Sequence, residues 1–204
     1  MYIGYAILIA VSVIIYLGFA QRALDRLHLS DRGALAFLLA IIVGGFLPDI
    51  PLGGDLGINI GGGLVPVIIC GYLWATAERG EIIRSIVAVV VAGTAVYLLM
   101  KIYPAEPTYG VLLDPLYIAA LVAGVMGYLT GRSRRGAFIA GTLAIIINDL
   151  GAQVENYLAG VSPTGVIGGA GVLDAVVIAG ILALGLAEVL GESLERVVRS
   201  TEQP

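Results

Sequence analysis

Three carboxylates lie inside a stretch of the chain that is otherwise apolar and rich in glycine. The stretch runs from Ile145 to Leu182 and contains Asp149, Glu155 and Asp174. Burying an ionisable side chain in an apolar environment is costly, so those found there usually bind ions, carry protons or take part in catalysis. We therefore predict a functional site in this stretch.

Asp149 is the deepest of the acids in the predicted helix 137–158, about 18 Å from the start of that helix at 1.5 Å per residue. Asp149, Gln153 and Asn156 are spaced i, i+4 and i+7, which places them in one polar stripe on one helical face. Such a stripe must face protein or water and not lipid. Glu155 lies on another face, nearer the end of the helix, and is interpreted as a rim charge.

Asp174 follows a glycine-rich segment and begins the next predicted helix, where free backbone N–H groups and the helix dipole stabilise a negative charge. It either caps that helix or forms a site together with Asp149. Asp49, Asp55 and Asn59 lie in an earlier glycine-rich segment. These residue types favour turns and caps, and they could also close over the same cavity.

The composition places the whole chain in the membrane. It has 204 residues, of which 59% are hydrophobic and only 13% are charged, and its mean hydropathy is +0.99. Soluble domains have about twice that share of charged residues. Apolar runs of roughly 20 residues predict helical spans and not the short alternating strands of a membrane barrel. We expect one integral membrane domain over 1–190 and a polar cytoplasmic tail over 191–204.

The predicted fold is an all-α polytopic bundle of about seven transmembrane helices. The helices are expected at 3–20, 33–47, 60–76, 82–102, 115–130, 137–158 and 172–190. Glycine and proline interrupt the helical pattern in two segments, Phe46–Pro66 and Ser162–Asp174. Irregular backbone at membrane depth persists only where protein or a cavity surrounds it, and paired interruptions of this kind point to a transporter-like binding site. The resemblance between Ile60–Gly63 and Ile167–Ala170 leaves open whether the two segments form a parallel internal repeat.

The basic residues predict the orientation. Ten of the 11 Lys and Arg residues fall in loops on one side of the predicted bundle: Arg22, Arg26, Arg32, Arg79, Arg84, Arg132, Arg134, Arg135, Arg196 and Arg199. Cytoplasmic loops carry the excess of basic residues, so the amino terminus is expected outside and the carboxyl terminus in the cytoplasm. The outer half is then acidic, and both interrupted segments lie near the outer face.

Three motifs resemble an uncharacterised prokaryotic membrane family, domain of unknown function 1614. They are DIPL at Asp49–Leu52, INIGGGLVP at Ile58–Pro66 and IGGAGVLDAVVIAGI at Ile167–Ile181. The family usually has Asn before Ile-Pro-Leu, where this chain has Asp49, and a Thr-Phe-Asp-Gly-like run where this chain has Val172–Ala175. The resemblance implies a polytopic membrane fold and retains the acid at Asp174, but it brings no agreed activity.

Three functions fit these residues. The preferred interpretation is transport or binding of a cation or a proton-coupled small solute in an outward-facing acidic cavity, with Asp149 and Asp174 as ligands or proton carriers. An intramembrane aspartyl protease would use the same two acids as a catalytic dyad, although the Tyr-Asp and Gly-x-Gly-Asp signatures of presenilin-like proteases are absent from these positions. A non-enzymatic scaffold or accessory protein is the third.

The sequence indicates no cofactor. A zinc site lacks ligands, because the single His28 and the single Cys70 lie in different predicted segments. A hard cation needs only oxygen ligands and remains compatible with the acids and with Asn59. No glycine-rich loop is followed by a basic residue that would meet a phosphate, so nucleotide or nucleic-acid binding has no support. The expected partners are the lipid bilayer and a cation or small polar solute.

Overall fold

The computed structural model describes residues 17, 18, 21, 27, 31–102, 115–131 and 133–201, and it gives side chains as far as residue 189. The predicted helix 3–20 falls almost wholly outside these residues, as does the whole connection 103–114 between two predicted helices. The described chain is mostly helical, which agrees with the predicted fold class in its main feature.

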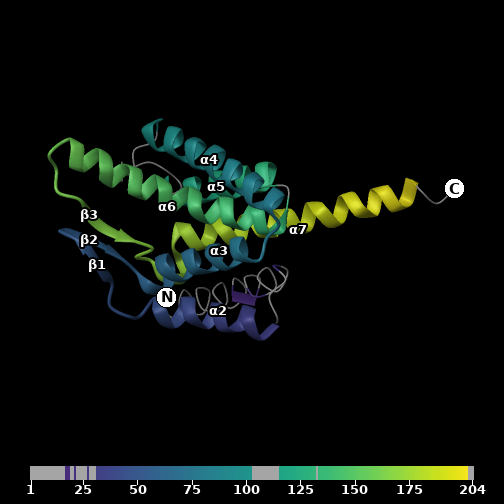
Figure 1. Ribbon diagram of the computed structural model, residues 1–204, viewed down its shortest axis with the longest axis horizontal. Coiled ribbons are helices and arrows are strands. Elements are labelled where there is room, and N and C mark those ends of the chain that lie inside the picture. Colours follow the sequence, from purple (N-terminus) through teal and green to yellow (C-terminus); the bar gives the residue numbers. More distant parts are fainter. Residues whose placement is uncertain are drawn as a thin grey trace, which may run out of the picture.

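Four helices form the main bundle (Figure 1). They are α4 (Arg79–Ile102), α5 (Pro115–Gly131), α6 (Arg134–Leu158) and α7 (Ala175–Thr201). α6 packs against each of the other three helices, and α5 also packs against α4 and α7. Three of these helices match the predicted ranges closely. α7 instead continues past the predicted end at 190, and Figure 1 shows its last turns projecting beyond the bundle.

Two shorter helices pack beside this bundle. α2 (Asp31–Gly44) and α3 (Val65–Ala75) contact each other, and α3 also contacts α6. A five-residue π-helical segment, η1 (Ile60–Leu64), leads into α3. The predicted helix 33–47 therefore ends earlier than expected, and the predicted helix 60–76 divides into η1 and α3.

The chain also contains a small sheet, so the prediction of a purely α-helical fold is wrong in this respect. Its three strands are β1 (Ile50–Gly53), β2 (Asp55–Ile58) and β3 (Thr164–Ile167), in the order β1-β2-β3. β1 and β2 form an antiparallel hairpin, whereas β2 and β3 run parallel. Pro48, Pro51 and the neighbouring glycines prevent a helix here, and pairing between the strands satisfies the backbone groups instead.

The parallel pair brings the two glycine-rich and proline-rich segments together. Asp55 lies opposite Thr164, and Ile58 lies opposite Ile167. The pairing extends one residue further, because the backbone N–H of Asn59 donates to the carbonyl of Ile167 at 2.9 Å. Each strand then leads into a helix, α3 after β2 and α7 after β3. The two interrupted segments thus form two neighbouring strand-to-helix connections.

Glycine is required where these connections meet. A Cβ on Gly62 would overlap the carbonyl oxygen of Gly168, and a Cβ on Gly168 would overlap the backbone of Gly62 and Gly63. Gly168 also has a φ of +76°, a conformation that other residues adopt at a cost. The backbones of η1 and of the segment after β3 therefore lie closer together than any side chain would allow.

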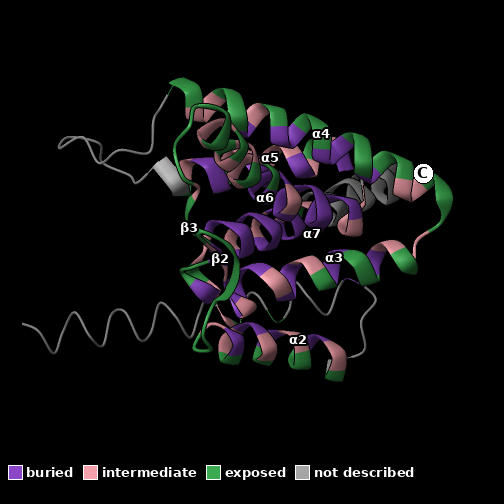
Figure 2. Ribbon diagram, turned by 60° about the vertical axis from the view of Figure 1, so that its left-hand side comes forward, coloured by how far each residue is buried: buried purple, intermediate pink, exposed green. Residues whose placement is uncertain are grey.

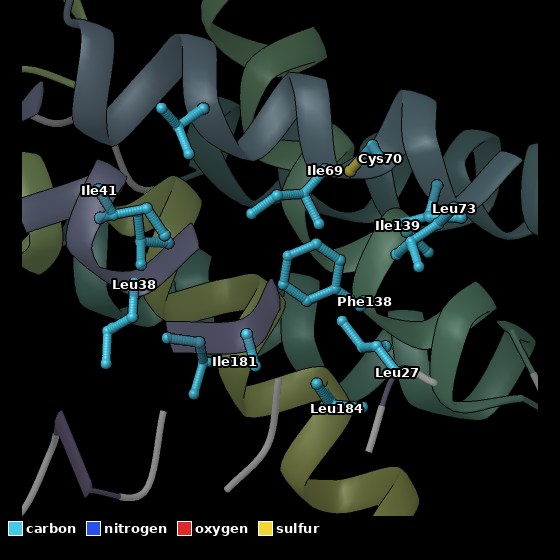
Figure 3. Close-up of a cluster of buried hydrophobic side chains, with 14 of the residues drawn as sticks. Leu27, Leu38, Ile41, Ile69, Cys70, Leu73, Phe138, Ile139, Ile181 and Leu184 are labelled. Atoms are coloured by element: carbon cyan, nitrogen blue, oxygen red, sulfur yellow. The ribbon is translucent and has the colours of Figure 1, made fainter. Parts of the chain in front are cut away.

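The buried core consists of two clusters that meet along α6. One contains residues of α2, α3, α6 and α7, including Leu38, Ile69, Phe138 and Ile181 (Figure 3). The other joins α4, α5, α6 and α7 with β3, and it is rich in alanine, which lets these helices approach closely. Figure 2 shows the buried residues on the facing sides of the helices.

Two helices of the described chain are long and apolar enough to span a membrane, namely α4 and α6. Four shorter apolar helices lie beside them, in the ranges 32–44, 60–75, 117–131 and 175–189. α4 also exposes large apolar side chains along its outer side, including Ile83, Val87, Val90 and Leu98. Exposed apolar surface of this extent is typical of a membrane or protein contact.

Candidate functional site

Asp149 lies on the face of α6 that meets β3 and the start of α7. Four residues before it, Ile145 packs in the same buried cluster as Ile167 of β3 and Val176 of α7. Four residues after it, Gln153 is bonded to the first residue of β3. Residues four apart share one helical face, so the half-buried carboxyl group of Asp149 lies on the face that these contacts define.

Gln153 fixes the start of β3. Its side-chain N–H donates to the carbonyl of Thr164 at 3.0 Å, and its side-chain oxygen accepts the N–H of Thr164 at 3.1 Å. The predicted polar stripe therefore faces protein at this position. Asn156 is half-buried one turn further on, and its backbone carbonyl accepts the N–H of Val161.

Asp174 caps α7 with one carboxylate oxygen and binds the turn before η2 with the other. Oδ1 accepts the N–H of Val176 at 3.0 Å, and Oδ2 accepts the N–H of Ala170 at 3.2 Å. The residue comes directly after the short 3₁₀ segment η2 (Gly171–Leu173) and directly before the first residue of α7. Such a cap satisfies backbone donors that the helix itself leaves free.

The charges of Asp149 and Asp174 interact with each other. Asp149 lies on the α6 face that meets the start of α7, and Asp174 directly precedes that helix, so their like charges repel each other across this junction. The hydrogen bonds of the described residues include none between the two carboxyl groups. The arrangement is a pair of neighbouring acids, with one oriented by backbone donors and the other half-buried on a long apolar helix.

Asn59 is almost fully buried and organises the first strand-to-helix connection. Its Oδ1 accepts the N–H groups of Gly61 at 3.0 Å and Gly62 at 2.9 Å. Its Nδ2 donates to Oδ1 of Asp49 at 2.8 Å. Both residues therefore serve as cap and turn residues here. The signal in the sequence was an Asn two residues before a run of three glycines, since Asn is a typical N-cap residue.

The two remaining predicted acids lie at the surface. Asp55 is exposed at the start of β2. Glu155 accepts a hydrogen bond from Tyr97 and forms an ion pair with Lys101, each at 2.6 Å. The Glu155 side chain is 43% exposed, as expected for a rim charge.

Among the described residues, few side chains that commonly bind metal ions lie in this region. Nowhere in the described part of the chain do three His, Cys, Asp or Glu side chains come together as a metal site would require. Asp149 and Asp174 would supply at most two carboxylates to a site here.

Comparison with known proteins assigns the chain to a family. The family described as "Protein of unknown function (DUF1614)" matches residues 27–186. The chain belongs to this family. The match covers α2 to the middle of α7, and it includes both strand-to-helix connections and every candidate site residue. No curated protein and no solved structure matches the chain.

Proposed function

We propose that this DUF1614 protein is a multi-pass membrane protein of the cell membrane that binds a cation or a proton at Asp149 and takes part in its transport. The observation that carries the proposal is the position of Asp149. It is a half-buried carboxylate on a helix long enough to span a membrane, beside the charge of Asp174 and beside two interrupted segments. Acids in such positions mark ion and proton pathways, and a bound positive charge would relieve the repulsion between them.

The membrane assignment rests on the apolar helices and on the distribution of charge. The α3–α4 turn and the α5–α6 turn lie side by side, because Ser133 donates to Glu81 at 2.8 Å and Arg135 donates to the Thr76 carbonyl at 3.2 Å. Arg79, Arg84 and Arg134 lie at this same end, which we call the basic end. We propose that it faces the cytoplasm, with about seven spans and the amino terminus outside.

Cysteine labelling tests this orientation. In a Cys70→Ala background, which removes the single native cysteine, Asp55→Cys places a thiol at the sheet and Glu78→Cys places one at the basic end. Both positions are exposed. A membrane-impermeant maleimide added to intact cells should label the variant at position 55 and spare the variant at position 78 until the cells are opened. The reverse pattern would contradict the orientation, and labelling of both in intact cells would contradict the spanning arrangement.

The geometry supports ion binding better than proteolysis. An aspartyl protease dyad shares a proton between two carboxyl groups that activate water. Both oxygens of Asp174 accept backbone N–H groups of the connection that begins α7. If Asp174 took up the shared proton of a dyad, these bonds would weaken, because backbone N–H groups stabilise the charged form of a carboxyl group. An electrostatic role toward an ion at Asp149 leaves the charged cap in place.

Transport is tested with purified protein in liposomes that contain a pH-sensitive dye. Gradients of NaCl, KCl, LiCl and CaCl₂ are applied in turn, and ion-driven proton movement is followed. Asp149→Asn is expected to lower the initial rate by more than about tenfold, the effect of losing about 1.4 kcal/mol of binding.

Asp55→Asn is the matched control, because it makes the same chemical change at an exposed position of the sheet. It should keep a rate within about twofold of the unchanged protein, since exposed charges have weak effects. Equal rates for the unchanged protein and Asp149→Asn would contradict the proposal. So would the absence of movement with every salt, which would favour a scaffold or a protease.

A further inference from the structure

We infer that the outward side of α2, the turn after it and β1 contact the acyl chains of lipids, and that β1 completes the membrane crossing that α2 begins. The crossing then ends with the β1–β2 hairpin at the outer boundary of the bilayer. This inference rests on the proposed function, in its membrane-spanning arrangement. It adds a lipid-contacting surface and gives the small sheet a position in the bilayer.

Exposed apolar side chains follow the chain from α2 into β1. Leu39 and Val43 are exposed and lie four residues apart, so they share one side of α2. Phe46, in the turn after α2, is 88% exposed. Ile50 and Leu52 are exposed and lie two residues apart, so they share one face of β1. We call these five residues the α2–β1 strip.

The other side of α2 is buried. Leu38 and Ile41 pack into the core cluster with residues of α3, α6 and α7 (Figure 3). The helix therefore has one side fixed against the protein and one side uncovered, which is the arrangement of a helix at the outside of a membrane bundle.

The chemistry of the α2–β1 strip matches acyl chains better than a protein partner. Residues 33–47 contain only Gly, Ala, Val, Ile, Leu and Phe. Protein interfaces have a polar rim and a regular share of hydrogen bonds, and side chains of these types cannot supply them. Acyl chains require no hydrogen bonds. The strip thus continues the exposed apolar surface that α4 presents through Val87 and Val90.

β1 is also poorly suited to pairing with a strand of a second copy. It is an edge strand, on the side of the sheet away from α6 (Figure 1). Pro51 has no N–H to donate, and the register with β2 is irregular between Pro51 and Gly53. Prolines and irregularities of this kind protect edge strands from pairing with another chain. The exposed side chains of β1 are therefore left to a partner that needs no backbone pairing, such as lipid.

The lengths of two helices give the depth of the hairpin. α2 begins at the basic end (Figure 1), and its 14 residues rise about 21 Å, which is short of a hydrocarbon core of about 30 Å. Gln153, which is bonded to Thr164 at the start of β3, lies about 28 Å along α6 from Arg134. Asp55 pairs opposite Thr164, so the hairpin tip reaches the outer boundary. β1 thus covers the distance that α2 leaves.

A boundary position also suits the backbone of β1. An open sheet edge does not occur in contact with the hydrocarbon region, because its N–H and C=O groups would lack partners there. At the boundary, water reaches the backbone edge, while the side chains of Ile50 and Leu52 remain available to the acyl chains. The hairpin therefore lies at the interface and not in the middle of the bilayer.

Fluorescence quenching of the full chain in liposomes tests the inference. Phe46→Cys and Leu52→Cys are made singly in the Cys70→Ala background and labelled with a nitrobenzoxadiazole dye. Phosphatidylcholine with a nitroxide near the headgroup or in the middle of the acyl chain reports the depth of the dye, and iodide reports its contact with water. Both variants should lose fluorescence to the lipid nitroxides, and the Leu52 variant should lose more to the nitroxide near the headgroup.

Two control positions calibrate the depth. Val90→Cys is exposed on α4, about 17 Å from the start of that helix, and should be quenched most by the nitroxide in the middle of the chain. Asp55→Cys is exposed at the hairpin tip and should be quenched by iodide and little by either lipid. All four substitutions are at exposed positions, so the fold should be retained.

The outcomes separate the inference from the proposed function. Quenching of positions 46 and 52 by iodide alone would overturn the inference, and so would stronger quenching of position 52 by the nitroxide in the middle of the chain. Protection of both positions from all three quenchers would show that protein covers the α2–β1 strip, as in a dimer, and would overturn it too. In each case, lipid quenching at position 90 leaves the membrane-spanning arrangement intact. Absence of lipid quenching at position 90 would contradict that arrangement itself.

Discussion

Replacing Gly62 with alanine is expected to abolish or severely weaken the fold. The new Cβ would overlap the carbonyl oxygen of Gly168 and would lie 2.8 Å from that of Gly171. Both obstacles are backbone atoms, which cannot rotate away as the end of a flexible side chain can. Overpacking a core costs about 1–3 kcal/mol and sometimes more, and here the two strand-to-helix connections would have to separate. We expect a loss of at least about 3 kcal/mol, which lowers the melting temperature by about 6–12 °C.

Two other glycines provide graded controls for this substitution. Gly45 lies near the same junction, and its added Cβ would be 3.3 Å from the Gly171 Cα, so Gly45→Ala should have a smaller effect. Gly71 is exposed on α3 with nothing within 4 Å. Gly71→Ala should be neutral or stabilising by up to about 1 kcal/mol, because alanine favours the helix. Thermal unfolding in detergent measures all three, and equal melting temperatures for the Gly62 and Gly71 variants would show that the close approach is not needed.

The sequence predicted where the long helices and the two interrupted segments lie, but it did not predict the structure of the interrupted segments. The helices α4, α5 and α6 were predictable because their apolar runs are long and their ends carry charge or proline. The two interrupted segments were recognised from Gly and Pro. Their pairing was not predicted, since β1 and β3 have four residues each and show no alternating buried pattern. The partners of β3 lie far away in the sequence, and local propensity contains no information about such pairing.

For the candidate site, the positions of residues along a helix were predictable, but contacts between residues of different elements were not. The spacing of Asp149 and Gln153 placed them on one helical face, and the structure shows that this face meets β3. The cap at Asp174 was one of two alternatives that its place before an apolar run allowed, the other being a site shared with Asp149. The bond between Asn59 and Asp49 could not be predicted, because it depends on a hairpin that brings two residues together across β1 and β2.

Replacing Asn59 with leucine is expected to destabilise the protein by about 2–5 kcal/mol. The Asn59 side chain accepts the N–H groups of Gly61 and Gly62 in a position that is only 3% exposed. Leucine has a similar size but no acceptor, so two buried N–H groups would lose their partner. Each such loss costs about 1–3 kcal/mol. Thermal unfolding in detergent should show the decrease, and a melting temperature within 2 °C of the unchanged protein, a shift of about 1 kcal/mol or less, would contradict the capping role.

Exchanging the side chains of Asn59 and Asp49 separates the contribution of the capping bonds to stability from the contribution of the contact between these two residues. Asn59→Asp keeps the acceptor for the two glycines but sets two carboxylates against each other where Nδ2 and Oδ1 now lie 2.8 Å apart. Asp49→Asn alone should have a small effect, because an amide oxygen still accepts from Asn59 and Asp49 is exposed. Combining the two substitutions restores one donor and one acceptor with reversed direction. We therefore expect the double variant to be more stable than Asn59→Asp by about 1–2 kcal/mol, a coupling typical of residues in direct contact. Additive effects of the two substitutions would show that this contact contributes nothing, and the connection would then depend on the glycine caps alone.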